Sequence, residues 1–151
     1  MFQPFRELAK SLNSRKVRYL VIGGNAVALH GVPRNTFDLD ILIEPTLENA
    51  ARVLDALRDV QMWTADLTTP ERMLKTPITG FNDRIPLDVM SRVPGVRFTT
   101  AWKNRVFRVL DGVRFAILSR RDLIRSKRAS GRPQDLEDVT ALIRKRHRSS
   151  N

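Results

Sequence analysis

The sequence predicts one domain of the α/β (α+β) class, in which a small mixed β-sheet is flanked by helices. Segments with helical periodicity alternate with short runs of β-branched and apolar residues, the pattern of strands packed against helices. The 151 residues, 42% hydrophobic and 28% charged, have the composition of an ordinary globular protein and can bury one core. We therefore expect residues 1–145 to form the domain and residues 146–151 to be a basic flexible tail.

Apolar periodicity and chain breakers predict five elements in the first half of the chain. Each helix has apolar residues at helical spacing, and each strand is a short run of β-branched, aromatic or aliphatic residues. We expect Asn25 and Thr46 to cap the helices that follow them, and Gly31 to end the shorter helix. In chain order, the predicted elements are a helix over 4–14, a strand over 17–22, a helix over 25–31, a strand over 37–44 and a helix over 46–60.

The second half gives mixed signals at first and clearer ones later. Residues 60–84 contain two prolines and a glycine, and only a short helix around PERMLK is expected there. Asp111 followed by Gly112 is a preferred type I′ turn and predicts a hairpin between two apolar runs. Ser119, with Asp122 three residues later, makes a capping box that opens a helix. The remaining predicted elements are a strand over 84–90, the hairpin over 106–118, a helix from Ser119 to about Arg128 and a helix from Asp135 to about Lys145.

The formal net charge of +11 predicts a polyanionic partner. Much of the excess lies in SRRDLIRSKRASGR and IRKRHRSSN, so we expect a basic C-terminal face for RNA, DNA or nucleotide phosphates; a solvated tail is the alternative. The absence of cysteine excludes disulfides and thiolate metal ligands. No apolar run approaches the roughly 20 residues that span a bilayer, and MFQPFRELAK lacks the apolar core of a signal peptide. We therefore expect a cytoplasmic protein without membrane contact.

Two aspartates lie one residue apart in the apolar run FDLDIL. Alternate residues of a strand point the same way, so Asp38 and Asp40 should project side by side while Phe37 and Leu39 pack beneath. Carboxylates so placed repel each other unless a cation lies between them, and oxygen ligands of this kind suit Mg²⁺ or Mn²⁺. Asp88, on a neighbouring predicted strand, could supply a third carboxylate. A D-x-D pattern alone is also often only the exposed face of a strand.

Residues around the aspartates favour the metal interpretation. Gly23 and Gly24 fall at a predicted strand-to-helix turn, where glycine lets a phosphate approach the backbone and a helix N-terminus offers free N–H groups. A plain tight turn is the alternative. Arg34 and Thr36 precede the aspartates and can offer a cation and a hydroxyl to an anion. Together the residues indicate a site for a metal and a phosphate.

The stretch GGNAVALHGVPRNTFDLDILI resembles the signature of the DNA polymerase β-like nucleotidyltransferase superfamily. That signature is Gly followed by Gly or Ser, a spacer, an acidic-apolar-acidic triplet and a third acidic residue on a later strand. Within the superfamily the chain is most similar to the small bacterial group that includes the AbiEii-type toxins, whose late basic stretch and aspartate-rich helix are matched here by KRASGRPQDLEDV. The resemblance covers most of residues 17–43, a short segment around Asp88 and residues 119–143, and it implies the polymerase β-like fold.

The resemblance also implies roles for individual residues. Asp38 and Asp40 would bind the metals, and Asp88 would be the third ligand and help to deprotonate the acceptor hydroxyl. Many members have Gly-Ser, whose serine hydroxyl holds a phosphate. Gly24 has no hydroxyl, and Asn25 or Thr36 could substitute for it. Late basic residues would contact the nucleotide or the acceptor, with an aspartate to orient them. The residues expected to bind the nucleoside triphosphate are Gly23, Gly24, Asn25, Arg34, Thr36, Lys127, Arg132 and Asp135.

These observations predict a nucleotidyltransferase that uses Mg²⁺ or Mn²⁺ to move a nucleoside monophosphate from a nucleoside triphosphate to an acceptor hydroxyl. The basic charge favours RNA as the acceptor, and a toxin–antitoxin context stays open, as does a protein partner. The alternatives are a small-molecule, antibiotic-type nucleotidyltransferase, an antitoxin that covers a partner, and a non-catalytic nucleic-acid-binding module. Trp63 and Trp102 are expected in the core, with base stacking as the alternative. Asp135 and Asp138 share a helical face, either as a salt-bridged surface or to orient a substrate.

Overall fold

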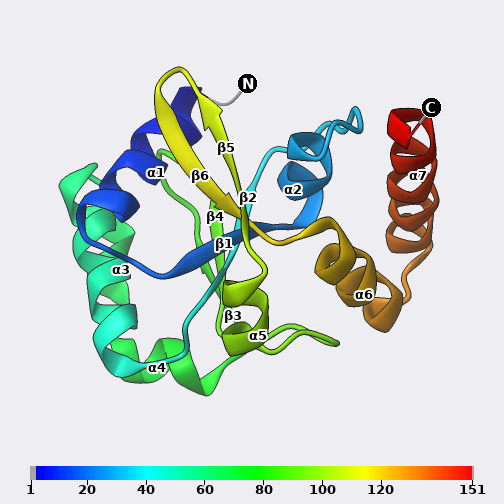
Figure 1. Ribbon diagram of the computed structural model, residues 1–151. Helices are drawn as coiled ribbons and strands as arrows, with labels where there is room; N and C mark the ends of the chain where they lie inside the picture. The colour runs from blue at the N-terminus through cyan, green and yellow to red at the C-terminus, as the bar shows by residue number, and fades with distance from the viewer. Residues whose placement is uncertain (1–2, 151) are drawn as a thin grey trace.

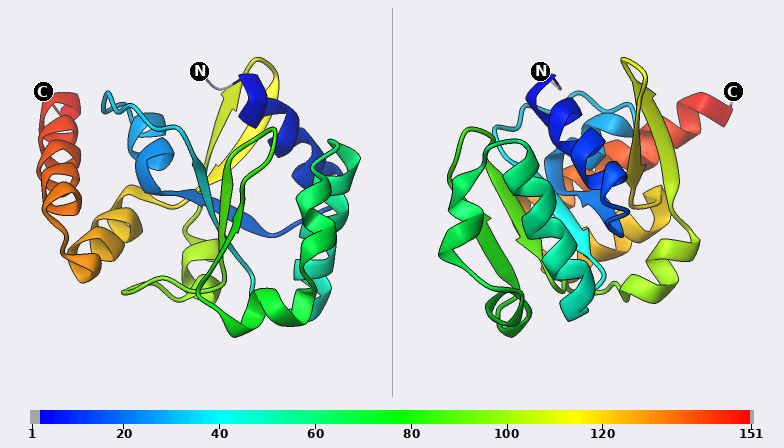
Figure 2. Two further views of the ribbon diagram at one scale, coloured as in Figure 1. Left: turned by 180° about the vertical axis from the view of Figure 1, so that it is seen from behind. Right: turned by 90° about the vertical axis from the view of Figure 1, so that its left-hand side faces the viewer.

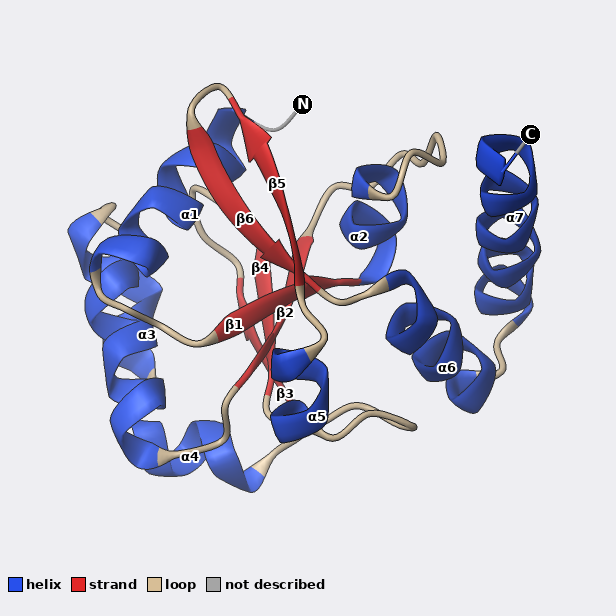
Figure 3. Ribbon diagram, viewed as in Figure 1, coloured by secondary structure: helices blue, strands red, loops and turns tan. Residues whose placement is uncertain are grey.

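The computed structural model describes the backbone of residues 3–150 and the side chains of residues 4–145. Six strands form one mixed sheet in the order β3-β4-β2-β1-β6-β5 (Figures 1 and 3). Strand β1 is antiparallel to β2 and parallel to β6, and β2 is parallel to β4. The strands are β1 (Tyr19–Ile22), β2 (Leu39–Ile43), β3 (Ile78–Phe81), β4 (Leu87–Met90), β5 (Val106–Leu110) and β6 (Val113–Ile117).

Helices cover the sheet on both sides, which confirms the predicted fold class. In Figure 1, α1, α3 and α4 lie on one side and α2, α6 and α7 on the other, and both views of Figure 2 agree. The helices are α1 (Gln3–Ser14), α2 (Gly23–Leu29), α3 (Leu47–Asp59), α4 (Pro70–Lys75), α5 (Phe98–Lys103), α6 (Arg120–Ser130) and α7 (Pro133–Ser150), with a 3-10 helix, η1, at Trp63–Leu67. None of these helices is both long and apolar enough, over the described residues, to cross a membrane.

Local sequence signals place several elements where they were expected. Thr46 caps α3, because its side chain accepts a hydrogen bond from the Asn49 N–H, and Ser119 caps α6 in the same way through the Asp122 N–H. The β5–β6 hairpin turns at Asp111, whose φ is 49°, and the next residue is a glycine with φ of 78°. These positive values are those of the predicted type I′ turn.

Two predictions next to the aspartates are wrong. Asn25 does not cap α2, because the helix already begins at Gly23 and Asn25 is buried in its first turn. The second strand begins at Leu39 rather than at residue 37, since pairing with β4 starts there and the Leu39 N–H donates to the Pro86 carbonyl. Phe37 therefore precedes the strand and is 90% exposed instead of packed beneath it.

Other differences lie where the sequence pattern is weak. Strand β3, η1 and α5 were not predicted, and strands β1 and β4 are shorter at their starts than expected. Trp63 is 60% exposed, which corrects its expected place in the core, whereas Trp102 packs against the core from a half-buried position. Helix α7 extends to Ser150, past the predicted end. The side chains of residues 146–150 and all of residue 151 lie outside the described part, so the flexible tail stays a prediction.

The central strands, which carry several of the predicted site residues, form the apolar centre of the sheet. Leu20 and Val21 of β1 and Ile41 and Leu42 of β2 are fully buried between the two helical layers. The ends of these strands are consequently held in a fixed relation by the ladder and by packing on both faces. Gly23 follows the last residue of β1, and Asp40 is the second residue of β2.

Candidate active site

Three neighbouring strands bring Gly23, Asp40 and Asp88 together. In the ladder, Asp40 lies opposite Ile22 of β1 and opposite Asp88 of β4, and Gly23 follows Ile22. Gly23 has a φ of 67°, and a Cβ at this position would collide with the Asp40 carboxylate. Glycine is therefore required here for two reasons, its backbone conformation and the space that Asp40 occupies.

The pKa values of both paired aspartates are raised, although Asp40 itself acts to lower the pKa of Asp88. Burial, followed by the charges of Asp88 and Asp38, raises the pKa of Asp40 to about 7, although Lys127 opposes the shift. Burial and the charge of Asp38 also raise the pKa of Asp88. Two carboxylates with these shifts favour a shared proton or a bound cation over two free charges.

Asp38 occupies a different environment from the other two aspartates. It lies on an exposed bend before β2, and its backbone carbonyl accepts a 2.7 Å hydrogen bond from Asn25 Nδ2. Within the part of the chain that the structure describes, no group of three or more histidine, cysteine, aspartate or glutamate side chains is arranged to hold a metal ion. The described geometry is therefore an Asp40–Asp88 pair with Asp38 nearby, and the predicted three-carboxylate metal site stays a prediction.

The Gly23-Gly24 turn is packed against the loop that leads into β2. A Cβ on Gly24 would collide with the methyl group of Thr36 and would lie 3.6 Å from Arg34 Cγ. Thr36 Oγ1 and Asn25 Oδ1 are buried and have no hydrogen-bond partner among the described residues. Both candidates for the missing hydroxyl of the Gly-Ser signature therefore lie near Gly24, with a free polar atom each.

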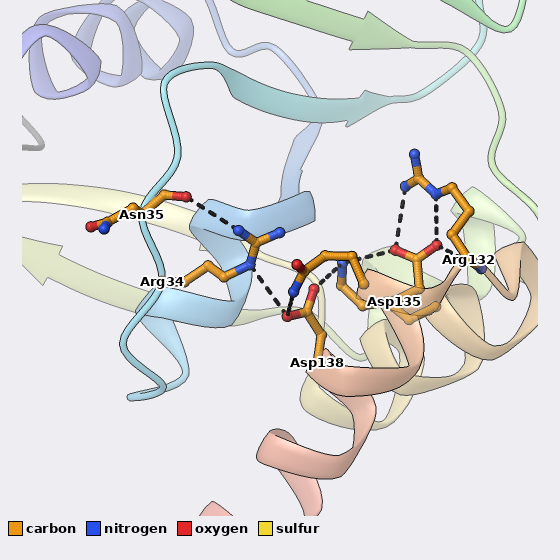
Figure 4. A network of polar contacts seen from close by, with 7 residues as sticks. Arg34, Asn35, Arg132, Asp135 and Asp138 are labelled. Atoms are coloured by element: carbon orange, nitrogen blue, oxygen red, sulfur yellow. Dashed lines mark hydrogen bonds and ion pairs between the residues drawn. The ribbon is translucent and has the colours of Figure 1, made fainter.

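A buried network of ion pairs joins α6 and α7 to the same loop (Figure 4). Lys127 Nζ lies 2.9 Å from Asp138 Oδ2 and 3.4 Å from Asp135 Oδ1, and all three side chains are buried. Arg132 Nε lies 2.8 Å from Asp135 Oδ2, and Arg34 Nε lies 3.2 Å from Asp138 Oδ1. The network fixes the two helices relative to the loop that carries Arg34.

The charge of Asp135 is favoured by its partners. Burial acts to raise its pKa, but hydrogen bonds and charges from Arg132 and Lys127 outweigh burial and hold the pKa below its usual value. Asp138, its neighbour one helical turn later, was noted in the sequence only for this spacing. Its contact with Arg34 spans 104 residues of chain, a distance that helical periodicity does not reveal.

Two hollows in the surface meet at this point. One has a volume of about 300 Å³ and a partly apolar wall that includes Ile78, Met90 and Val93. The other lies over the glycine turn and is bordered by Gly24, Arg34 and Gln134. The residues common to both hollows are Gly23, Asp40, Lys127, Arg132 and Asp135. A ligand with an anionic part and a flatter apolar part fits a cleft of this composition.

The structure gathers seven of the predicted site residues around these hollows and places four others behind or beside them. Asp88 pairs with Asp40 in the sheet, Asn25 and Thr36 lie under the turn, and Asp38 lies on the bend. Wall residues from β3 and the loop before α5, such as Ile78 and Arg92, were missed because those segments carry no recognisable motif. The seven are Gly23, Gly24, Arg34, Asp40, Lys127, Arg132 and Asp135.

A mixed sheet with a double-glycine turn beside paired aspartates defines the nucleotidyltransferase class. The chain belongs to the family described as "Nucleotidyltransferase of unknown function (DUF6036)", which it matches over residues 1–145. Its fold is similar to the crystal structure of an antigenic nucleotidyltransferase-like protein from Paracoccidioides brasiliensis. That likeness has a TM-score of 0.57 at 17% sequence identity and covers 91% of this chain and 72% of the other. No curated protein matches the chain. The match confirms the predicted nucleotidyltransferase superfamily, whereas the narrower AbiEii-type group stays a prediction.

Proposed function

We propose that the protein transfers a nucleoside monophosphate from a nucleoside triphosphate to a hydroxyl group of RNA, in the cytoplasm. The observation that carries the proposal is the ladder register, which sets Asp40 opposite Asp88 and directly beside the Gly23 turn. Carboxylates that can bind a divalent cation thus lie next to a turn without side chains, which a phosphate can approach. A nucleoside triphosphate with its metal ion needs both.

The donor set of Asp40 and Asp88 fits a magnesium or manganese ion. Both ligands are hard carboxylate oxygens, they lie side by side, and their mutual repulsion is relieved by a cation. Asp38 would complete the set from the adjacent bend. When bound there, the ion would neutralise phosphate charge and assist the departure of pyrophosphate.

The other residues of the cleft would bind and orient the nucleotide. Gly23 and Gly24 have no side chains to keep a phosphate away from the backbone. Arg34, Lys127 and Arg132 would offset the triphosphate charge, and the ion pairs with Asp135 and Asp138 hold them in position. Asp88 would help to deprotonate the attacking hydroxyl, the role that the resemblance to the superfamily implies for the third carboxylate.

RNA is the acceptor that the charge favours over a small molecule. The whole chain carries a formal net charge of +11, and Arg120, Arg121, Arg125 and Arg128 border one hollow on α6. The narrower resemblance to the AbiEii-type toxins supports a toxin–antitoxin context within this proposal. A protein partner would use apolar surface instead, and Trp63 and Leu67 are both exposed on η1.

The test is a transfer assay with the purified protein, Mg²⁺ and each α-labelled nucleoside triphosphate in turn. Total RNA, protein and small metabolites serve as separate acceptor pools, and Asp40→Asn is the matched control because it keeps the shape of the side chain. Label in the RNA pool that Asp40→Asn does not produce would support the proposal. Label in the metabolite or protein pool would replace RNA as acceptor, and no label in any pool would overturn the transferase function.

A further inference from the structure

Two hollows lie side by side on a part of the surface that the proposed active site does not use. One, of about 420 Å³, lies between the start of β1, the end of α5 and strands β5 and β6. The other, of about 430 Å³, lies between α1 and the β5–β6 turn. Asn13 and Arg114 border both, so the two hollows form one continuous surface.

Arginines stacked on aromatic rings line the first hollow. The Arg105 guanidinium lies 3.9 Å from the centroid of the Trp102 ring, and the Arg114 guanidinium lies 3.6 Å from that of Phe107. Trp102 is stacked in turn on Phe98 at 5.6 Å between ring centroids. These contacts hold each guanidinium plane in one orientation. Arg105 Nε is buried and has no hydrogen-bond partner among the described residues.

The surface is strongly positive. Of the described residues that border the two hollows, six are basic and one, Asp111, is acidic. Arg18 is offset by Glu44 at 2.9 Å, whereas no described ion pair neutralises the others. The basic residues are Arg6, Lys10, Lys16, Arg18, Arg105 and Arg114. An anionic chain would gain from several of these charges at once.

Helix α5 connects this surface to the active site. Arg92, Val93 and Pro94, in the loop before α5, border the hollow that contains Asp40, while Trp102, near the end of α5, borders the basic hollow. Strand β1 gives the separation, because Tyr19 borders the basic hollow and Gly23 follows the other end of the strand. At 3.3 Å per residue the two ends of β1 are about 10 Å apart.

We propose that this arginine–aromatic surface, defined by Lys16, Trp102, Arg105, Phe107 and Arg114, binds a single-stranded segment of the RNA acceptor. Oriented guanidinium planes and aromatic rings are the groups on which unstacked RNA bases stack, and the surrounding charges track the phosphates. The α6 hollow is also basic, but no aromatic residue borders it among the described ones. The role as acceptor site depends on the proposed function, whereas RNA binding does not.

The test measures binding of a fluorescently labelled single-stranded RNA, longer than about 16 nucleotides, by anisotropy over a salt series. Lys16→Glu with Arg114→Glu changes two exposed residues of the surface. We expect at least roughly tenfold weaker binding, and a salt dependence that is shallower by about 1.4 in log–log slope, because two phosphate contacts are lost. Arg114→Lys keeps the charge but not the plane, so it should weaken binding severalfold with an unchanged slope.

Two further double variants with the same change in net charge are compared, the first as the control and the second as a test of the competing α6 hollow. Arg52→Glu with Arg72→Glu alters α3 and α4, and Arg121→Glu with Arg125→Glu alters the α6 hollow. The proposal is overturned if the α6 variant loses binding and the Lys16/Arg114 variant does not, or if all three variants lose it equally. Wild-type affinity in Arg114→Lys would overturn the stacking contribution and leave charge alone.

The proposed function fails separately from this inference. Asp40→Asn should retain RNA affinity, since Asp40 does not border the arginine–aromatic surface, even though it loses transfer. RNA binding that depends on Lys16 and Arg114 in a protein without transfer activity would support the surface and contradict the enzyme. The opposite result is a Lys16/Arg114 variant that transfers to limiting RNA as well as the wild type does. That result would contradict the proposed RNA-binding surface and support the proposed enzyme activity.

Discussion

Two pairs of aspartates, each with one member that borders the cleft, differ in what balances their charge. Asp40 and Asp88 face each other across a strand ladder. Burial raises the pKa of both, with the charges of Asp88 and Asp38 adding to the shift of Asp40 and the charge of Asp38 adding to that of Asp88. Asp135 and Asp138, one helical turn apart, are more deeply buried, yet they share Lys127 and each also has an arginine partner. The first pair has no full partner in the described chain, and the second pair has more than one.

Under the proposed function, the difference separates the residues that would bind the ligand from those that build the wall of its site. A buried carboxylate pair without a cation destabilises the fold, so its presence in the ladder points to a ligand from outside. A buried carboxylate pair with its own cations needs nothing further, and its value lies in holding Lys127, Arg132 and Arg34 in place. Substitutions in the two pairs should therefore have opposite effects on stability and activity.

The largest effect on stability is expected from Lys127→Met. The substitution removes the cation that Asp135 and Asp138 share and leaves two buried carboxylates underpaired, which should lower the free energy of unfolding by about 3–5 kcal/mol. Urea unfolding measures the loss. Arg58→Met is the matched control, because Arg58 also joins two aspartates but is exposed, and about 0–1 kcal/mol is expected there. Equal losses in the two variants would contradict the contrast.

Asp40→Asn should reduce the rate of transfer by at least about a hundredfold. Substitution of a residue that only supports a metal ligand already lowers activity about 10–100-fold. Asp40 is proposed as a ligand itself, so a larger loss is expected. Its stability should stay the same or increase, because the substitution removes repulsion with Asp88. The assay is transfer to RNA, with thermal unfolding of the same sample. Asp138→Asn should show the reverse pattern, with a clear loss of stability and no loss of transfer beyond what unfolding explains. Unfolding of the Asp40→Asn protein would contradict the difference between the two pairs.

Gly23→Ala tests how closely the turn and the ligand-binding pair fit. The positive φ costs about 1–3 kcal/mol for a residue with a side chain, and the new Cβ would displace the Asp40 carboxylate. Gly112→Ala separates these two causes, since Gly112 also has a positive φ but nothing lies within 4 Å of its Cβ position. Both variants should lose stability by urea unfolding, and only Gly23→Ala should lose transfer. Transfer that survives in Gly23→Ala would place the chemistry away from this turn.

Local sequence patterns predicted the glycine turn and Asp40, but they did not predict much of the cleft wall. Gly23, Gly24 and Asp40 were predicted because a strand, a double-glycine turn and an alternating aspartate are short-range patterns. Asp138 carried only a weak signal, because its role comes from Arg34, far away in the chain. Strand β3 was missed because pairing with β4, rather than its own composition, makes ITGF a strand.

The contrast between local patterns and long-range pairing also explains why the second strand was wrongly predicted to include Asp38. The alternation of FDLDIL is a correct strand signal, but the position at which a strand begins depends on where its neighbour can pair. Strand β4 begins at Leu87, and its partner β2 accordingly begins at Leu39. Asp38 is thereby left on the exposed bend, where the Asn25 side chain binds its carbonyl oxygen. Local patterns thus predicted which residue types lie near the turn, and pairing between distant segments decided which carboxylates face each other.

The smallest expected effect is a pH dependence on the wall side of the cleft. Because the pKa of Asp135 is held below its usual value, its ion pairs contribute stability above the ordinary pKa of about 3.9 and lose it as the pH falls through the lowered value. Asp135→Asn cannot titrate, so it should be less stable than the wild type at pH 7, and the gap should narrow in acid. Urea midpoints measured from neutral pH to about one unit below the ordinary pKa provide the test. A gap that stays constant over this range would mean that Asp135 acts through packing and neutral hydrogen bonds rather than through its charge, and the contrast between the two aspartate pairs would then rest on Lys127 and Asp138 alone.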